Sequence, residues 1–174
     1  MDTTGRPAPE EVATYYLPYI TLAKGTSLVE ALEHAGRETD ALARRIPAEK
    51  GDHRYAEDKW TIKEVIQHVI DAERIFAYRA LRFARNDATP LPGFDENEYT
   101  PAARAARRTL AELFDELATV RAATISLFAS FDQEMLMRNG TANGKTMSVR
   151  GLGWTTAGHA LHHLRVIEER YLNN

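Results

Sequence analysis

The amino-acid sequence predicts an all-α fold: a four-helix bundle with an irregular N-terminal arm and a short hairpin-like turn before the last helix. Apolar residues recur at helical spacing in four segments, and residues that favour helix starts precede them. Two Asn-Gly steps, at Asn139 and Asn143, separate the third segment from the fourth and are typical of tight turns in a β-hairpin. Four amphipathic helices in 174 residues indicate one bundle domain over residues 1–174.

The predicted arm covers residues 1–25, which precede the periodic part of the chain. We expect irregular structure there, with at most a short helix, lying across the domain. This segment contains three prolines, which interrupt a helical pattern, and three aromatic residues: Pro7, Pro9 and Pro18, and Tyr15, Tyr16 and Tyr19. The first nine residues are polar and lack the apolar stretch of a signal peptide, so we expect a cytoplasmic protein.

The first two helices have clear start signals. Ser27 followed by Glu30, and Thr61 followed by Glu64, both have the spacing of a capping box. The first helix should end at Pro47, and the second should run to about residue 86, before a segment rich in proline and glycine. Their apolar positions are Leu28, Ala31, Leu32, Ala35, Thr39, Leu42 and Ile46, and then Ile62, Val65, Ile66, Val69, Phe76, Ala80 and Phe83.

The third and fourth helices are predicted from the same kind of pattern. Thr100 before Pro101 indicates a cap and a first helical residue, with the third helix running to about residue 132. Ser148 should cap the fourth helix, which runs to about Tyr171. The apolar positions are Leu110, Leu113, Phe114, Leu117, Thr124 and Phe128, and then Val149, Leu152, Thr156, Ala160, Leu164, Ile167 and Tyr171.

Composition excludes several function classes. The formal net charge is −3 and basic residues do not form a block, so nucleic acid is not the expected partner. Arg104, Arg107 and Arg108 form only a small local group. The chain has no cysteine, which rules out disulfides, thiolate metal sites and a cysteine nucleophile. No apolar run approaches the roughly 18 residues that span a bilayer, so we expect no membrane segment.

Two charged residues fall in the middle of apolar stripes. Glu73 lies within that of the second helix and Arg121 within that of the third. An isolated buried charge is costly, so each should have a partner. We therefore predict that Glu73 and Arg121 pair across the bundle; the alternative is that one of them reaches solvent near a helix end.

The histidines are the main candidates for chemistry. His159 and His163 are four residues apart, share a helix face and fall within or beside the apolar stripe, whereas His162 points away from it. His68 lies on the flank of the second helix, where the interior meets a cleft. We expect these residues, His68, His159 and His163, to hold one metal ion with an open coordination position. His34 and His53 are expected to face solvent. The alternative is that the inward-facing histidines are hydrogen-bonded core residues without a metal.

Several motifs together resemble the DinB/YfiT-like family of metal-binding four-helix bundles. They are the run from Trp60 to His68 with Asp71 and Glu73, the segment from Pro90, the Asn143-Gly144 turn, and the run from Gly158 to His163. The resemblance covers about residues 19–171. It implies that His68, His159 and His163 bind a divalent ion, commonly zinc or nickel. It also implies a homodimer, and a hydrolase, a transferase of low-molecular-weight thiols such as bacillithiol, or a mycothiol-dependent isomerase.

Chemistry at such a site has two forms that the sequence does not separate. A metal ion on three histidines can activate water, or it can bind and deprotonate a substrate thiol. We therefore expect a metal-dependent hydrolase or thiol S-transferase that acts on a small molecule. A non-catalytic, stress-associated dimeric metal-binding protein is the alternative. Asp71 and Glu64 lie one turn from His68 and could orient its ring, although both could equally be exposed helix charges.

Overall fold

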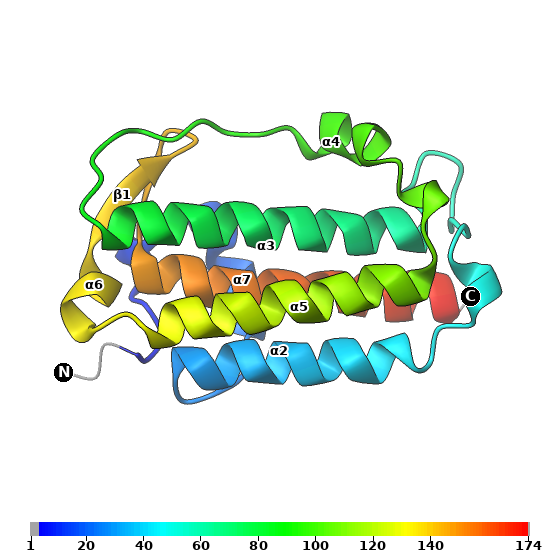
Figure 1. The fold of residues 1–174 in the computed structure, drawn as a ribbon, viewed down its shortest axis with the longest axis horizontal. Coiled ribbons are helices and arrows are strands. Elements are labelled where there is room, and N and C mark those ends of the chain that lie inside the picture. Colours follow the sequence, from blue (N-terminus) through cyan, green and yellow to red (C-terminus); the bar gives the residue numbers. More distant parts are fainter. Residues whose placement is uncertain (1–3, 174) are drawn as a thin grey trace.

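The protein is an all-α four-helix bundle, as predicted (Figure 1). A computed structural model describes residues 4–173. The four long helices that lie side by side are α2 (Leu28–Ala43), α3 (Ile62–Ala84), α5 (Leu110–Ala129) and α7 (Val149–Val166), the last continuing as a π-helical turn (Ile167–Leu172). Shorter helices are α1 (Leu17–Leu22), α4 (Glu96–Ala103) and α6 (Gln133–Met137), with 3₁₀ turns at Pro9–Glu11, Thr14–Tyr16, Ala48–Lys50 and Ala105–Arg107. None of the helices in this described part is long and apolar enough to cross a bilayer.

The predicted helix caps form, with one difference. The Thr61 hydroxyl accepts from the Glu64 amide at 3.2 Å, and the Glu64 carboxylate accepts from the Thr61 amide at 2.7 Å. Ser148 Oγ accepts from the Gly151 amide at 3.0 Å. Ser27 caps α2, but the Glu30 carboxylate accepts from Thr26 instead of closing the box. Each cap occupies part of the free hydrogen-bonding groups at a helix start.

The predicted start of the third helix at Pro101 is wrong. Pro101 lies inside the short α4, which ends where Arg104 adopts the left-handed conformation with φ of 53°. The α5 helix starts afterwards, at Thr109, whose hydroxyl and backbone amide both bond to Glu112 in a complete capping box. The capping box of Thr109 and Glu112 is therefore the sequence signal that marks the start of this helix.

The N-terminal arm is more ordered than predicted where the structure describes it; residues 1–3 of the predicted arm lie outside that part. Its helix α1 packs directly against α7. This contact depends on Gly158, because a β-carbon there would lie 1.8 Å from the carbonyl oxygen of Tyr19. Glu11 anchors the arm by accepting from Ser148 Oγ at 2.9 Å and from Arg150 Nε at 2.8 Å.

The predicted hairpin is present between α6 and α7. Strands β1 (Asn139–Ala142) and β2 (Lys145–Ser148) pair antiparallel, with Asn143 and Gly144 at positive φ of 51° and 69° in the turn. Positive φ at both positions is the requirement of the tight turns that favour Asn-Gly. The segment that links α3 to α4 is fixed to this hairpin, because the Leu91 amide donates to Thr141 O at 2.9 Å and the Asn143 amide donates to Leu91 O at 3.0 Å.

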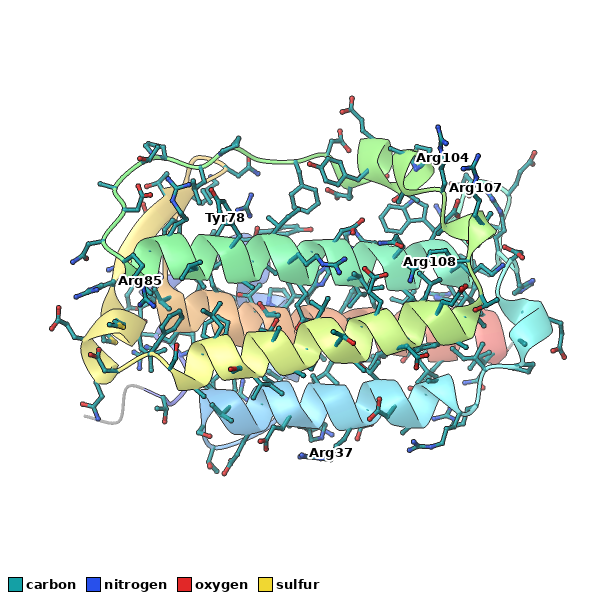
Figure 2. The ribbon with its side chains drawn as sticks, viewed as in Figure 1. Arg37, Tyr78, Arg85, Arg104, Arg107 and Arg108 are labelled. Carbon is teal, nitrogen blue, oxygen red and sulfur yellow. The ribbon has the colours of Figure 1, made fainter. Side chains whose placement is uncertain are left out.

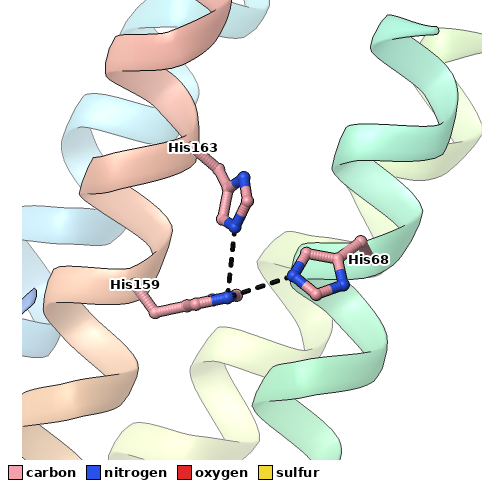
Figure 3. Close-up of side chains that lie close together, drawn as sticks. All are labelled: His68, His159 and His163. Carbon is pink, nitrogen blue, oxygen red and sulfur yellow. Dashed lines mark hydrogen bonds between the residues drawn. The ribbon is translucent and has the colours of Figure 1, made fainter. Parts of the chain in front are cut away.

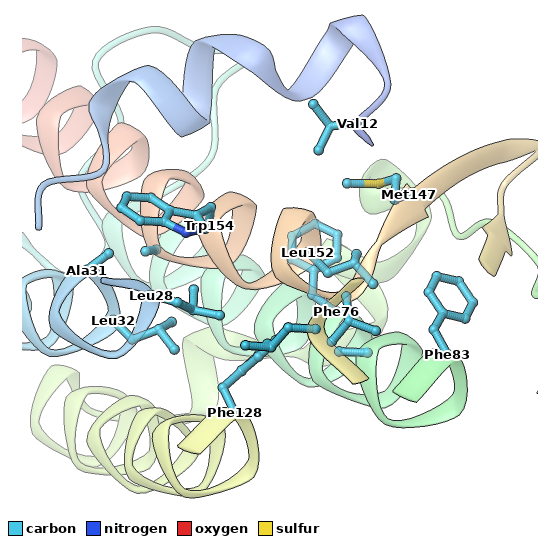
Figure 4. Close-up of a cluster of buried hydrophobic side chains, with 14 of the residues drawn as sticks. Val12, Leu28, Ala31, Leu32, Phe76, Phe83, Phe128, Met147, Leu152 and Trp154 are labelled. Atoms are coloured by element: carbon cyan, nitrogen blue, oxygen red, sulfur yellow. The ribbon is translucent and has the colours of Figure 1, made fainter. Parts of the chain in front are cut away.

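The interior is centred on α7. Residues 151–160 of that helix are all buried, beyond the one stripe that its periodicity indicates, because the arm and α1 cover the side left open by α2 and α3. Figure 4 shows side chains of the arm, α2, α3, α5 and α7 meeting in one apolar cluster, among them Val12, Leu28, Phe76, Phe128 and Trp154.

The predicted pairing of Glu73 with Arg121 is confirmed. Arg121 Nη2 donates to Glu73 Oε2 at 2.6 Å, and Nη1 donates to the Leu32 carbonyl at 3.0 Å. Both side chains are buried between α2, α3 and α5. The ion pair therefore joins three of the four long helices inside the core.

The arginines that Figure 2 labels are spread along the molecule. Arg37 lies on α2 and Arg85 at the end of α3, whereas Arg104, Arg107 and Arg108 lie between α4 and α5. Arg108 contributes no free charge to this last group, because it pairs with Glu116 and donates to Gln67.

Candidate metal centre

Three imidazoles from two helices converge at one point (Figure 3). His68 comes from α3, and His159 and His163 come from successive turns of α7. The Nε2 atom of His159 lies 3.1 Å from Nε2 of His68 and 3.2 Å from Nε2 of His163. The predicted i, i+4 pair and the predicted third residue on a facing helix are thus brought together.

Two of the three nitrogen–nitrogen distances fit a cation, and all three nitrogens lie within 4.8 Å of one another. Two ligand nitrogens at about 2.0–2.1 Å from one tetrahedral ion lie about 3.3 Å apart. Hydrogen bonding alone serves the cluster poorly, because the single Nε2 of His159 faces two other ring nitrogens and has either one lone pair or one hydrogen for both. The donor set consists of neutral nitrogens, which suits zinc or nickel.

Burial keeps the three rings neutral. Desolvation lowers the pKa of His68 from 6.5 to about 4. Desolvation, together with the charges of neighbouring imidazoles, holds the pKa values of His159 and His163 well below the usual value. Neutral imidazole is the form that binds metals, and each neutral ring has one nitrogen with a free lone pair at neutral pH.

The three remaining histidines occupy different environments. His162 lies outside the group of three, but it is half-buried, and its ring lies 5.0 Å from the ring of His163 and 5.2 Å from the ring of Tyr19. His53 is exposed, as predicted. The prediction that His34 faces solvent is wrong: it is half-buried on α2, and its Nδ1 is enclosed without a hydrogen-bond partner in the described chain. It lies on the flank of its helix, where neighbouring side chains cover it.

Neither carboxylate predicted beside His68 orients that ring. Glu64 is held by the Thr61 cap, and Asp71 accepts from Gln67 Nε2 at 3.0 Å. The carboxylate whose charge acts on His68 is instead Glu96, the first residue of α4, which raises the pKa of His68 against the effect of burial. The sequence carries no signal for this residue, because its position depends on how the segment after α3 folds back over the bundle.

A cavity of about 410 Å³ opens onto the histidines. Six aromatic residues from the arm, α3 and the loops that flank it line the cavity: Tyr15, Tyr16, Tyr19, Trp60, Phe76 and Phe94. Their rings also enclose the histidines directly, with Trp60 5.0 Å from His68 and Tyr19 5.4 Å from His159, centroid to centroid. The site is therefore a mostly apolar pocket of the size that holds a small molecule.

The cavity also contains polar groups outside the histidine cluster. They are Arg79, Glu96, Asn143 and Lys145. Arg79 follows His68 by eleven residues, which at 100° per residue places the two side chains about 20° apart on α3. The spacing of eleven residues from His68 therefore predicts that Arg79 shares the helix face of His68, although Arg79 is not one of the apolar positions of this helix.

Comparisons with known proteins agree with this architecture. A model of the DinB superfamily matches residues 31–167. The solved structure of YfiT from Bacillus subtilis, described as "a probable metal-dependent hydrolase with an unusual four-helix bundle topology", is similar, with a TM-score of 0.70 and 13% sequence identity. The match covers 97% of this chain and 95% of that chain. No curated protein matches the sequence.

Proposed function

The chain belongs to the DinB superfamily, and from this premise we propose that it is a metal-dependent enzyme acting on a small molecule. The observation that carries the proposal is the convergence of three imidazole nitrogens, from the buried His159 and the half-buried His68 and His163, on a cavity lined by aromatic residues. We propose that His68, His159 and His163 are the metal ligands. A divalent ion held by three neutral imidazoles acts as a Lewis acid and lowers the pKa of a water molecule or thiol that it binds.

The residues around the histidines would exclude water and hold the substrate. The rings of Tyr19, Trp60 and Phe76 cover the histidines from three different elements, which lowers the local dielectric and strengthens every charge interaction at the site. An apolar substrate body would pack against the same rings. The position of Tyr19 is set by the close approach of α1 to Gly158.

Glu96 is the candidate proton acceptor. It lines the cavity and is half-buried, and its charge acts on His68 as well as on the hydroxyl groups of Tyr16 and Tyr19. A carboxylate at this place could accept, on an Oε atom, the proton released by a water or thiol nucleophile. Asp71 and Glu64 are not among the residues that line this cavity.

The finer assignment is hydrolysis or transfer of a low-molecular-weight thiol, with zinc or nickel as the ion. The description of YfiT as a probable metal-dependent hydrolase supports the first activity. Thiol transfer uses the same open coordination position and stays the second candidate. A homodimer is also part of the proposal, on the family resemblance of the sequence alone. A cytoplasmic location is carried over as the expectation from the sequence.

A variant comparison tests the proposal. Untagged protein and His163→Ala should be screened with activated electrophiles and esters, with and without several low-molecular-weight thiols, after loading with zinc or nickel. We expect turnover that His163→Ala loses while its melting temperature stays near that of the wild type. His53→Ala, which removes an exposed histidine, serves as the matched control and should keep full turnover.

Two results would contradict it. A large loss of thermal stability in His163→Ala, with no turnover in any form of the protein, would make the cluster a structural site. Turnover that persists in His163→Ala would place the chemistry elsewhere. Dependence on an added thiol separates thiol transfer from hydrolysis.

A further inference from the structure

Arg79 is a buried cation without a carboxylate. Its side chain on α3 is only 4% exposed. Among residues 4–173 no acidic group lies within ion-pair distance of it, although arginine and carboxylate pair elsewhere in the same core. Desolvation lowers the pKa of Arg79, with partial compensation from the nearby Tyr16 hydroxyl. Burying a charge in this way is costly unless a counter-charge is supplied.

The contacts of Arg79 within the chain do not account for this cost. Nη2 donates to the carbonyl of Pro92 at 2.9 Å, and the guanidinium lies 6.0 Å from the centre of the Phe94 ring. Pro92 is an exposed residue, so water could hydrate its carbonyl without help from a buried cation. A guanidinium has five N–H donors, and one carbonyl and one hydroxyl leave most of them free.

The free donors face the cavity of the histidines. Arg79 and His68 both line that cavity and lie on one face of α3. Their Cα atoms are separated by eleven residues, or about 16 Å along the helix axis. A long α-helical side chain leans toward the N-terminus of its helix, which for Arg79 is the direction of His68. Between them the wall consists of Ala72 and Phe76, which are apolar.

We infer that Arg79 binds the carboxylate of an elongated, otherwise largely apolar substrate whose reacting end lies at the three histidines. This inference rests on the proposed function, since it assigns the substrate class of the same cavity. A single buried cation matches a monoanion, and the planar guanidinium fork matches the two oxygens of a carboxylate. A phosphate dianion would bring a second charge for which the buried wall offers no partner. Lys145, the other cation at the cavity, is exposed and in water contributes little.

Matched probes test the assignment by binding. Isothermal titration calorimetry should compare 4-phenylbutyrate with 4-phenylbutan-1-ol, which has the same body and no charge, on wild type, Arg79→Met, Arg79→Lys and Lys145→Met. We expect the wild type to bind the carboxylate about tenfold or more tightly than the alcohol. Arg79→Met should bind both probes equally, with its affinity for the alcohol nearly unchanged. Arg79→Lys should keep part of the preference, and Lys145→Met all of it.

The same titrations on His163→Ala separate this inference from the proposed function. A carboxylate preference that survives there supports the Arg79 site even if the metal chemistry fails. A preference that persists in Arg79→Met would mean that the carboxylate binds the metal or another cation, and would overturn the inference. Equal binding of both probes to the wild type would overturn it as well. A melting temperature of Arg79→Met well below that of Arg79→Lys, with no difference in probe preference, would make Arg79 a structural residue.

Discussion

The bundle buries two arginines, and they differ in where their counter-charge lies. Arg121 and Arg79 are 5% and 4% exposed. Arg121 meets Glu73 and the Leu32 carbonyl between α2, α3 and α5, so its charge is matched inside the chain. Arg79 meets no carboxylate among residues 4–173 and lines the cavity that contains the histidines. One buried arginine thus stabilises the packing of three helices, whereas the other lines a cavity that a ligand can enter.

The histidine cluster lines the same cavity as Arg79. Nε2 of His159 faces the Nε2 atoms of both His68 and His163 and cannot form a full hydrogen bond with each. Arg79 likewise has N–H donors that its contacts with the Pro92 carbonyl and the Tyr16 hydroxyl do not use. Buried polar groups normally find their partners within the protein. Where such groups line a cavity, a ligand can supply the partner.

The largest loss of stability is expected from removing the carboxylate that pairs with Arg121. Glu73→Ala leaves Arg121 buried without its carboxylate and should lower the free energy of unfolding by about 3–5 kcal/mol. Chemical denaturation measures this loss. Zinc affinity of the folded fraction should stay within about twofold, because the pair does not touch the histidines. A Glu73→Ala protein as stable as the wild type would show that the ion pair is dispensable.

Acid should lower the stability of the metal-free protein through the histidine cluster. In the unfolded chain imidazoles titrate near 6.5, whereas burial lowers the pKa of His68 to about 4, so the unfolded state binds more protons between these values. Stability of the metal-free protein should therefore fall as the pH decreases from about 6.5 toward 4, by on the order of 1–3 kcal/mol. Thermal melts at several pH values measure it.

A histidine variant checks the origin of this acid effect. His68→Asn should melt with a shallower pH dependence than the wild type, while His53→Asn should not change it, since His53 is exposed. An unchanged slope in His68→Asn would assign the acid sensitivity to other groups.

Gly158→Ala should open the wall of the cavity. The new β-carbon would collide with backbone atoms of Tyr19, which cannot rotate away, so α1 must shift. We expect a loss of about 1–3 kcal/mol in stability and weaker binding of small aromatic probes, with zinc affinity largely preserved. Gly144→Ala is a useful comparison, because it also changes a glycine but has open space around it; any cost there comes from its φ of 69°. Full retention of probe binding in Gly158→Ala would remove α1 from the account of the site.

The smallest effect is expected at Glu64. Glu64→Ala removes half of the capping box at Thr61 and should cost about 1 kcal/mol of stability. Because Glu64 does not contact His68, zinc affinity measured by competition with a chelator should not change. A tenfold loss of affinity would restore Glu64 as a residue that orients the ring.

Local signals predicted what local interactions decide. The caps at Thr61 and Ser148, the Asn143 turn and the i, i+4 histidines depend on residues within one or two turns, and all of them form. The Thr100-Pro101 step gave a wrong helix start, because the helix that contains Pro101 ends at Arg104 in a left-handed conformation. An arginine at that position does not indicate such an end.

Other features depended on contacts between distant segments. Glu96 reaches the cavity only because the chain after α3 is fixed to the hairpin through Leu91, and Tyr19 only because α1 lies on Gly158. No periodicity reports such contacts. Arg79 is the intermediate case: its helix face was predictable, but only the structure shows that no carboxylate among residues 4–173 pairs with it.

The most direct test of the central claim is the metal content of the protein. Untagged protein, stripped with a chelator and titrated with zinc, should bind one equivalent per chain with the nitrogen ligation that X-ray absorption can identify. His159→Ala, which removes the nitrogen that lies between the other two, should bind no stoichiometric zinc, whereas His34→Ala should bind as the wild type does. Equal zinc binding by His159→Ala and wild type, or none by either, would contradict the account.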